Sequence, residues 1–265
     1  MTSPSPLSAP AGSRWVNDMR MLAKMVWLEI KLFAREPLTL IFTLALPLLI
    51  LMVLGGIFGG RPIQGGRYVG IRAMDYYLPG YVGLVLASIG TISLPVHLAG
   101  YRERGILRRF RASGMKESSM LASQTLVTIA IAIVGSMLLF ALGAGAYGVH
   151  GPRSFGDFAV VFVISTFCFT SLGVLLASAM PTARAAQAVG LLIWFVMMFL
   201  SGTDGPLDLL PAGLLDVGKA LPLYHVVIPM VDAWNGFGIN VMQVGIVAAV
   251  GLAATAITLR VFRWE

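Results

Sequence analysis

The chain has 265 residues, of which 57% are hydrophobic and 12% charged, with a formal net charge of +7 and a mean hydropathy of +0.85. This composition is much more apolar than that of a soluble domain, so lipid is the expected solvent for most of the chain. Apolar runs of about 20 residues recur, which is the length that an α-helix needs to cross a bilayer. The runs are continuous rather than alternating, which argues against a β-barrel.

The beginning of the chain differs in composition from the rest. Residues 1–13 are rich in Pro, Ser and Ala and lack the apolar core of a secretion signal, so they predict a disordered tail. We expect residues 14–265 to form a single transmembrane domain. The only cysteine, Cys168, lies within an apolar run, so it predicts a small buried side chain, and no internal disulfide is possible.

Residues 14–36 predict an amphipathic helix that lies on the inner leaflet, since polar positions recur at helical spacing opposite an apolar face. A membrane anchor is the simplest role for this helix. Pro37 is expected to end it and turn the chain into the bilayer. Its basic positions are Arg20, Lys24, Lys31 and Arg35.

Six transmembrane helices are expected, which makes this an all-α membrane protein. The even number puts both termini on one side of the membrane. That side holds fourteen of the 19 Lys and Arg residues, so we expect both termini to be cytoplasmic. The predicted spans are residues 38–58, 78–99, 120–147, 157–180, 185–201 and 240–262.

Residues 202–239 are too apolar for a free loop and contain four prolines. They predict broken helices that enter the outer leaflet and return, as an outer re-entrant segment.

A short basic stretch, residues 101–116, lies between the second and third spans. It has two possible interpretations: its side chains pair with anionic lipid, or it is a docking element for a protein partner. Nucleic acid is not an expected partner, because only Tyr101 and Phe110 are available for base stacking. Its six basic residues are Arg102, Arg104, Arg108, Arg109, Arg111 and Lys116.

The chain shows no enzyme signature. Residues 213–220 resemble a phosphate-binding loop, but Ala220 replaces the Ser or Thr that would hold magnesium. The three histidines have no metal-ligand spacing. Asp204, Asp208 and Asp232 are expected near the outer boundary rather than within a span, which weakens the case for a proton-coupled carrier. We expect no catalytic residue, metal or cofactor in this chain.

Two clusters in the spans allow more than one interpretation. Gly55 and Gly59 belong to a small-xxx-small pattern that permits close helix approach, although such patterns are common in membranes. The aromatic and methionine side chains of the fifth span predict either a surface for apolar substrates or ordinary packing. Those side chains are Trp194, Phe195, Met197, Met198 and Phe199.

Several stretches, in this order, resemble the permease subunits of ABC type-2 exporters. The opening of the first span (35–47), the start of the second (77–81), the basic stretch (101–113) and the proline-containing segment (201–224) are similar to motifs of that family. Two positions depart from the pattern. Ile106 replaces a small hydroxyl residue, and Thr203-Asp204-Gly205 replaces a more apolar stretch.

The resemblance implies that residues 101–116 are a coupling helix, seated in a groove of a separate cytoplasmic ATPase that binds ATP and Mg. In this interpretation charged side chains contact the ATPase, Leu107 and Phe110 pack against it, and Gly105 lets the backbone turn. The charged residues are Arg102, Glu103, Arg104, Arg108 and Arg109.

The resemblance also implies two ATPase subunits and a second permease, either an identical copy or a related chain. The first and fifth spans would face each other across that interface and enclose the path. The candidate path or interface residues are Phe42, Gly55, Gly59, Trp194, Phe195 and Met198. The candidate outer gate residues are Pro206, Pro211, Pro222 and Tyr224.

We therefore expect a multi-pass permease of a prokaryotic cytoplasmic membrane that exports an amphipathic or lipid-like compound of the drug or antibiotic class. An ABC permease for a glycan or glycolipid is the first alternative. A carrier or channel that needs no ATPase is the second.

Overall fold

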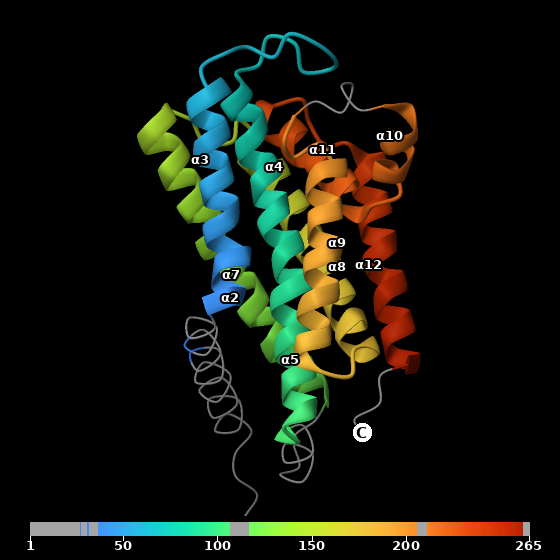
Figure 1. Ribbon diagram of the computed structural model, residues 1–265. Helices are drawn as coiled ribbons and strands as arrows, with labels where there is room; N and C mark the ends of the chain where they lie inside the picture. The colour runs from blue at the N-terminus through green and yellow to red at the C-terminus, as the bar shows by residue number, and fades with distance from the viewer. Residues whose placement is uncertain (1–26, 28–30, 32–36, 107–116, 206–210, 262–265) are drawn as a thin grey trace, which may run out of the picture.

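The computed structural model describes residues 27, 31, 37–106, 117–205 and 211–261, and they form an elongated bundle of helices (Figure 1). The only strand-like pairing in this part of the chain is a single bridge between Pro62 and Arg72. Six helical segments are long and apolar enough to cross a membrane, which confirms the predicted number. Trp27 and Lys31 are exposed, and the rest of the predicted amphipathic helix lies outside the described residues.

The six spans lie close to the positions that hydropathy predicts. The first consists of α2 (Pro37–Leu40), the π-helical η1 (Ile41–Ala45) and α3 (Leu46–Phe58); the second of α4 (Ala73–Ser88), η2 (Ile89–Ser93) and α5 (Leu94–Glu103). The others are α7 (Glu117–Tyr147), α8 (Phe155–Ala179), α9 (Ala183–Leu200) and α12 (Val241–Val261). Two shorter helices, α10 (Ala212–Lys219) and α11 (Pro222–Asn235), precede the last span.

Both π-helical segments come just before a proline, Pro47 in the first span and Pro95 in the second. Proline has no amide hydrogen, and its ring pushes away the carbonyl four residues earlier, so the helix widens there. In the first span this carbonyl belongs to Thr43, and it lies 3.3 Å from the Ser88 hydroxyl, which it shares with the Val85 carbonyl at 2.8 Å. A polar side chain of the second span thus satisfies the backbone group that the proline frees.

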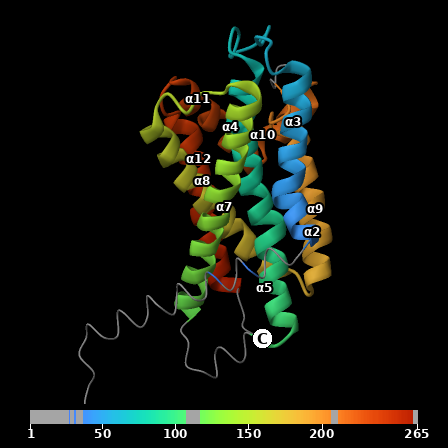
Figure 2. The same cartoon turned by 90° about the vertical axis from the view of Figure 1, so that its left-hand side faces the viewer.

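The second span is the centre of the bundle. Every residue from Tyr76 to Ser88 is buried, and α4 contacts α3, α7, α8, α9 and α11. Figure 2, turned by 90°, shows α4 between α7 and α3, with α7 in front. Because its contacts are all with protein, this helix can carry tyrosines and hydroxyl side chains at membrane depth.

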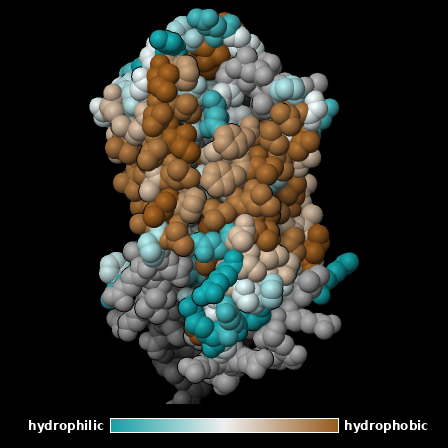
Figure 3. Space-filling model, in the orientation of Figure 1, coloured by the Kyte–Doolittle hydropathy of each residue, from teal (hydrophilic) through white to brown (hydrophobic). Residues whose placement is uncertain are grey.

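The other spans keep wide apolar faces on the surface. In the space-filling view, hydrophobic side chains form a continuous band between hydrophilic patches at the two ends (Figure 3). Exposed members include Leu49 and Val53 of α3 and Leu192 of α9. Such a band is what a helix bundle presents to lipid tails or to another membrane chain.

The two ends of the bundle have different characters. The end where α5 stops and α9 begins carries Arg102, Arg104, Arg184 and Arg260, and we name it the basic end. The opposite, distal end carries the loop after α3 together with α10 and α11 (Figure 1). The helices α10 and α11 meet at an angle of 83°. Their entry into the outer leaflet stays a prediction.

The structure differs from the sequence-based boundaries in one span. The second span begins at Ala73 rather than at residue 78, and its last helix continues to Glu103. The predicted boundaries, residues 78 and 99, left the polar residues Asp75 and Arg102 outside the span, whereas the structure includes both. Both belong to the helix because each has a polar partner, Arg72 for Asp75 and backbone carbonyls for Arg102.

Candidate functional site

The first part of the candidate site is the end of α5, which projects from the basic end beyond the neighbouring spans (Figures 1 and 2). Its last two residues are Arg102 and Glu103. Gly105 follows with a φ of 67°, in the left-handed region that glycine adopts without strain, so the chain turns there. The remaining predicted coupling residues lie outside the described part of the chain: Leu107, Arg108, Arg109 and Phe110.

Arg102 reaches across to the carboxyl end of α8. Its guanidinium donates to the carbonyls of Ala177 at 3.2 Å and Ser178 at 3.4 Å, and also to that of Met180. The last carbonyls of a helix have no partner within the helix and carry partial negative charge. The five donors of a guanidinium can satisfy several of them together, so Arg102 caps α8.

Glu103 reaches the amino end of α9. Its carboxylate accepts a hydrogen bond from the Ala183 amide at 3.1 Å, and the Thr182 hydroxyl accepts one from the Ala185 amide at 3.1 Å. A helix amino end presents free N–H groups and partial positive charge, which a carboxylate complements. Adjacent residues of opposite charge therefore hold the two helix ends of opposite polarity that flank the α8–α9 turn.

Arg104 has a different environment. Its side chain is exposed, and its guanidinium lies over the Tyr101 ring at 5.9 Å from the centroid. Arg104 and Glu103 are both exposed, but Glu103 is bonded to the start of α9, whereas the Arg104 guanidinium rests on a ring of its own helix.

The second part of the candidate site is an aromatic cluster between the first and fifth spans. The rings of Phe42, Trp194 and Phe195 lie with centroids 5.1 to 6.5 Å apart in edge-to-face pairs. Trp194 and Met198 are buried, and the Trp194 Nε1 donates to the Leu84 carbonyl at 3.4 Å. Phe195 is 37% exposed, so part of this aromatic cluster reaches the surface.

In the glycine pattern of the first span, Gly55 packs against another helix of the same chain. A Cβ added to Gly55 would lie 2.8 Å from the Tyr147 ring of α7, and the Tyr147 hydroxyl donates to the Met52 carbonyl at 2.6 Å. The close approach that Gly55 permits is therefore an approach of α7. Gly59 ends α3, where its amide bonds to the Gly55 carbonyl at 2.9 Å.

The third part lies at the distal end, where two tyrosines of α4 hold the segment after α9. The Tyr76 hydroxyl donates to the Gly202 carbonyl at 2.7 Å, and the Tyr81 hydroxyl donates to the Asp204 carboxylate at 2.5 Å. Burial raises the pKa of Asp204, and the hydrogen bond from Tyr81 opposes this shift. The stretch Thr203-Asp204-Gly205, which departs from the family pattern, thus supplies a hydrogen-bond partner for Tyr81.

Asp232 of α11 was expected in the open at the outer boundary, but it is 1% exposed. Its carboxylate accepts hydrogen bonds from Arg67 at 2.8 Å and from the Tyr68 hydroxyl at 3.0 Å. Burial, and after it the Asp232 charge, raises the pKa of Tyr68, so the hydroxyl keeps its proton and donates. The hydrogen bonds of Arg67 and Tyr68 to Asp232 thus attach the loop after α3 to α11.

The predicted gate residues occupy the same end. Pro211 precedes α10 and is exposed, Pro222 is the first residue of α11, and Tyr224 is half-buried with its ring against His225. Pro206 lies outside the described residues.

Residues 22–233 match the family model described as ABC-2 type transporter. The chain belongs to this family. It is 24% identical over 223 residues to the "Putative transport permease ycf38" of Cyanophora paradoxa, covering 82% of this chain and 73% of that protein. It is 26% identical over 186 residues to the "ABC transporter G family member 20" of Dictyostelium discoideum, covering 69% of this chain and 25% of that protein.

An ABC-2 type chain is a multi-pass transmembrane subunit of an ABC transporter, so transport is its established class of function. The matched residues include α5, the α8–α9 turn, the aromatic cluster and α11. All three parts of the candidate site therefore lie within the ABC-2 region.

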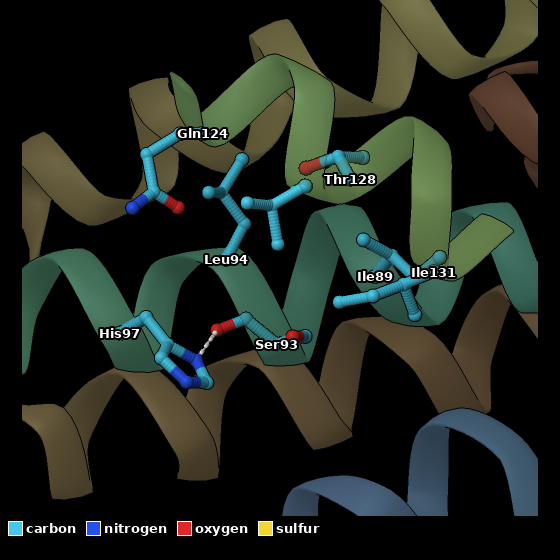
Figure 4. A pocket seen from close by; sticks show the side chains of 8 residues that line it. Ile89, Ser93, Leu94, His97, Gln124, Thr128 and Ile131 are labelled. Atoms are coloured by element: carbon cyan, nitrogen blue, oxygen red, sulfur yellow. Dashed lines mark hydrogen bonds between the residues drawn. The ribbon is translucent and has the colours of Figure 1, made fainter. Parts of the chain in front are cut away.

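A small cavity of this ABC-2 chain lies between the second span and α7 (Figure 4). It measures about 10 Å³, which is room for about one water molecule and none for a substrate. On its wall, His97 Nδ1 pairs with the Ser93 carbonyl at 2.9 Å. In the described part of the chain, no group of three or more His, Cys, Asp and Glu side chains is placed to hold a metal ion.

Sequence reasoning assigned no partner within the chain to Arg102, Glu103 and Asp232. The adjacent opposite charges at 102 and 103 were visible as a signal, but the helix ends that they contact are about 80 residues away in sequence. No spacing rule connects such distant positions.

Proposed function

We propose that this chain is the permease subunit of an ATP-driven exporter, with a separate ATPase that binds ATP and Mg at the basic end. The exporter moves an amphipathic or lipid-like compound of the drug or antibiotic class out of a prokaryotic cytoplasm or inner leaflet. In this proposal the basic end and both termini are cytoplasmic.

The observation that carries this proposal is the continuity of α5 with the buried helix α4. A subunit docked on the projecting end of α5 would act directly on the span that contacts most of the others. Packed interiors are stiff, so displacement of a central helix is passed to its neighbours. Exposed Arg104, together with the predicted residues 107–116, would provide the docking surface.

A second permease, identical or related, would complete the path. The first and fifth spans of one chain meet at Phe42 and Phe195 and keep apolar side chains on the surface beside them. Two such faces opposed across a two-fold axis would enclose an aromatic and apolar path, which suits an amphipathic substrate. At its distal end the predicted gate residues, Pro206, Pro211, Pro222 and Tyr224, would close the path.

Inside-out membrane vesicles that contain the chain and its native partners provide the test. We expect ATP-dependent uptake of rhodamine 6G or of a short-chain fluorescent phospholipid, absent without ATP. Arg104→Ala should lower uptake, whereas Lys219→Ala, an exposed change at the distal end, should leave it unchanged.

Uptake of a lipid-linked glycan instead of both probes would overturn the substrate class and favour the glycan permease. Uptake of any of the three without ATP would overturn the ATP-driven mechanism and favour a carrier or channel.

A further inference from the structure

We propose that Arg102 and Glu103 are positioning residues that fasten α5 to both sides of the α8–α9 turn. The second, fourth and fifth spans then move as one body when the ATPase acts on the basic end. The inference rests on the proposed function, and it gives these two residues a role that differs from contact with the ATPase.

The first argument is that each side chain already has partners within the chain. Arg102 donates to three carbonyls at the end of α8, and Glu103 accepts from the Ala183 amide at the start of α9. Hydrogen bonds that involve a charged group are stronger than those between neutral groups. To contact an ATPase instead, both side chains would have to leave helix ends that need them.

The second argument is the match between charge order and helix polarity. The positive residue contacts the negative, carboxyl end of α8, and the next residue, which is negative, contacts the positive, amino end of α9. Exchanging the two charges would place each against a helix end of its own sign. The contact is therefore specific for the order Arg then Glu.

The third argument is that the same three spans are also joined at mid-membrane by glycines. A Cβ on Gly90 of η2 would lie 2.4 Å from the Phe169 carbonyl oxygen, and one on Gly173 would lie 2.6 Å from that of Gly90. On α9, a Cβ on Gly190 would lie 2.0 Å from the Thr91 carbonyl oxygen. Backbones this close cannot slide past one another without separating.

Two levels of attachment therefore hold the second, fourth and fifth spans together, one at mid-membrane and one at the basic end. The fifth span carries Phe195 beside Phe42, so a displacement of α5 reaches the proposed path through α9. Arg104, which faces outward, is left to contact the ATPase.

A cysteine pair tests the rigid attachment. A Cβ on Gly100 of α5 would lie 3.7 Å from the Ala183 Cβ, which is a distance that a disulfide spans. It would also lie 3.2 Å from the Arg104 guanidinium, so the single variant Gly100→Cys controls for a displaced Arg104. We would combine Gly100→Cys and Ala183→Cys with Cys168→Ser and measure ATP-dependent uptake in vesicles before and after oxidation. We expect the cross-link to form and uptake to be the same in the oxidised and reduced proteins.

Loss of uptake on oxidation that a reductant reverses would overturn the proposal, because it would show that α5 and α9 must move apart. Failure of the two cysteines to cross-link would overturn it as well. Each single cysteine variant, oxidised in the same way, serves as the matched control.

Single substitutions separate positioning from docking. In Arg102→Ala and Glu103→Ala we expect the ATPase to co-purify as before, while transport per ATP hydrolysed falls about tenfold, as for loss of a charge-assisted hydrogen bond. Glu103→Gln keeps an acceptor oxygen for the Ala183 amide, and we expect it to restore much of the coupling. In Arg104→Ala we expect less ATPase to co-purify.

Loss of the ATPase in Arg102→Ala or Glu103→Ala would show that these side chains dock it directly, and unchanged coupling in both would show that they transmit no force. Absence of ATP-dependent uptake and of an ATPase from the wild-type chain is a separate result. It would overturn the proposed function, while the cross-linking yield would still report whether α5 and α9 are attached.

Discussion

The first and second spans have the same design but opposite surroundings. Each is an apolar helix with a π-helical segment followed by a proline, Pro47 in the first and Pro95 in the second. In the most apolar 18-residue stretch, 22% of the first span and all of the second are buried within the chain. The second span also carries the polar side chains, such as Tyr76, Tyr81 and Ser88.

The difference shows that burial within a membrane protein does not follow hydrophobicity. Lipid offers no hydrogen-bond partners, so a helix that faces lipid must be apolar, whereas a helix inside the bundle can use carbonyls of its neighbours. The second span does this with Tyr76 on the Gly202 carbonyl and Ser88 on the Thr43 carbonyl. Of these two spans, the less apolar one lies at the centre.

The largest expected effect comes from a matched pair of glycine substitutions. In Gly90→Ala the new Cβ would meet the Phe169 carbonyl oxygen at 2.4 Å, and such overpacking costs about 1–3 kcal/mol. In Gly56→Ala of the first span the nearest atom is the Tyr147 hydroxyl at 3.7 Å, and we expect no loss. The melting temperature in detergent measures both. Equal losses of melting temperature in the two variants would contradict the closer backbone packing around Gly90 than around Gly56.

The second effect concerns a buried carboxylate against an exposed one. Asp232→Ala leaves the buried Tyr68 hydroxyl without its acceptor, and we expect a loss of about 2 kcal/mol. Asp216→Ala removes an exposed pair with Lys219 and should change stability by less than about 0.5 kcal/mol. Thermal unfolding compares them. Similar values would mean that the loop after α3 does not depend on Asp232.

The smallest effect tests the bond between the two spans directly. Ser88→Ala removes a hydroxyl that is shared between the Val85 carbonyl of its own helix at 2.8 Å and the Thr43 carbonyl at 3.3 Å, at an expected cost of about 1 kcal/mol. Ser136 of α7 bonds only within its own helix, to the Ala132 carbonyl, so Ser136→Ala is the control with a smaller expected change. If Ser136→Ala costs as much, the link between the first and second spans contributes little.

Hydropathy predicted the six spans well because a continuous apolar run of sufficient length has few alternatives to a membrane helix. It failed at the ends of the second span, where Asp75 and Arg102 look like loop residues until their partners are known. The π-helical segments had a local signal in Pro47 and Pro95. The sequence contained no signal that α4 is buried, because the second span is less apolar than the first and a rule that buries the most apolar segments would place it nearer the surface.

The candidate site was predicted in part. The resemblance placed the first and fifth spans across an interface between two chains, which stays a prediction; within one chain the structure places Phe42 against Trp194 and Phe195. It gave Glu103 a contact with the ATPase, whereas the structure shows a contact with α9, about 80 residues further along the chain. Contacts between distant segments depend on the packed fold, and hydrogen-bonding groups alone do not indicate which distant helix end they will meet.

The measurement that tests the central claim most directly is purification of the chain from its native membranes in mild detergent, with mass identification and stoichiometry of what co-purifies. The account predicts one copy of a soluble ATPase per permease, lost when Arg104 and the predicted coupling positions 107–111 are changed together. Recovery of the chain without an ATPase, under conditions that preserve other membrane complexes, would contradict it.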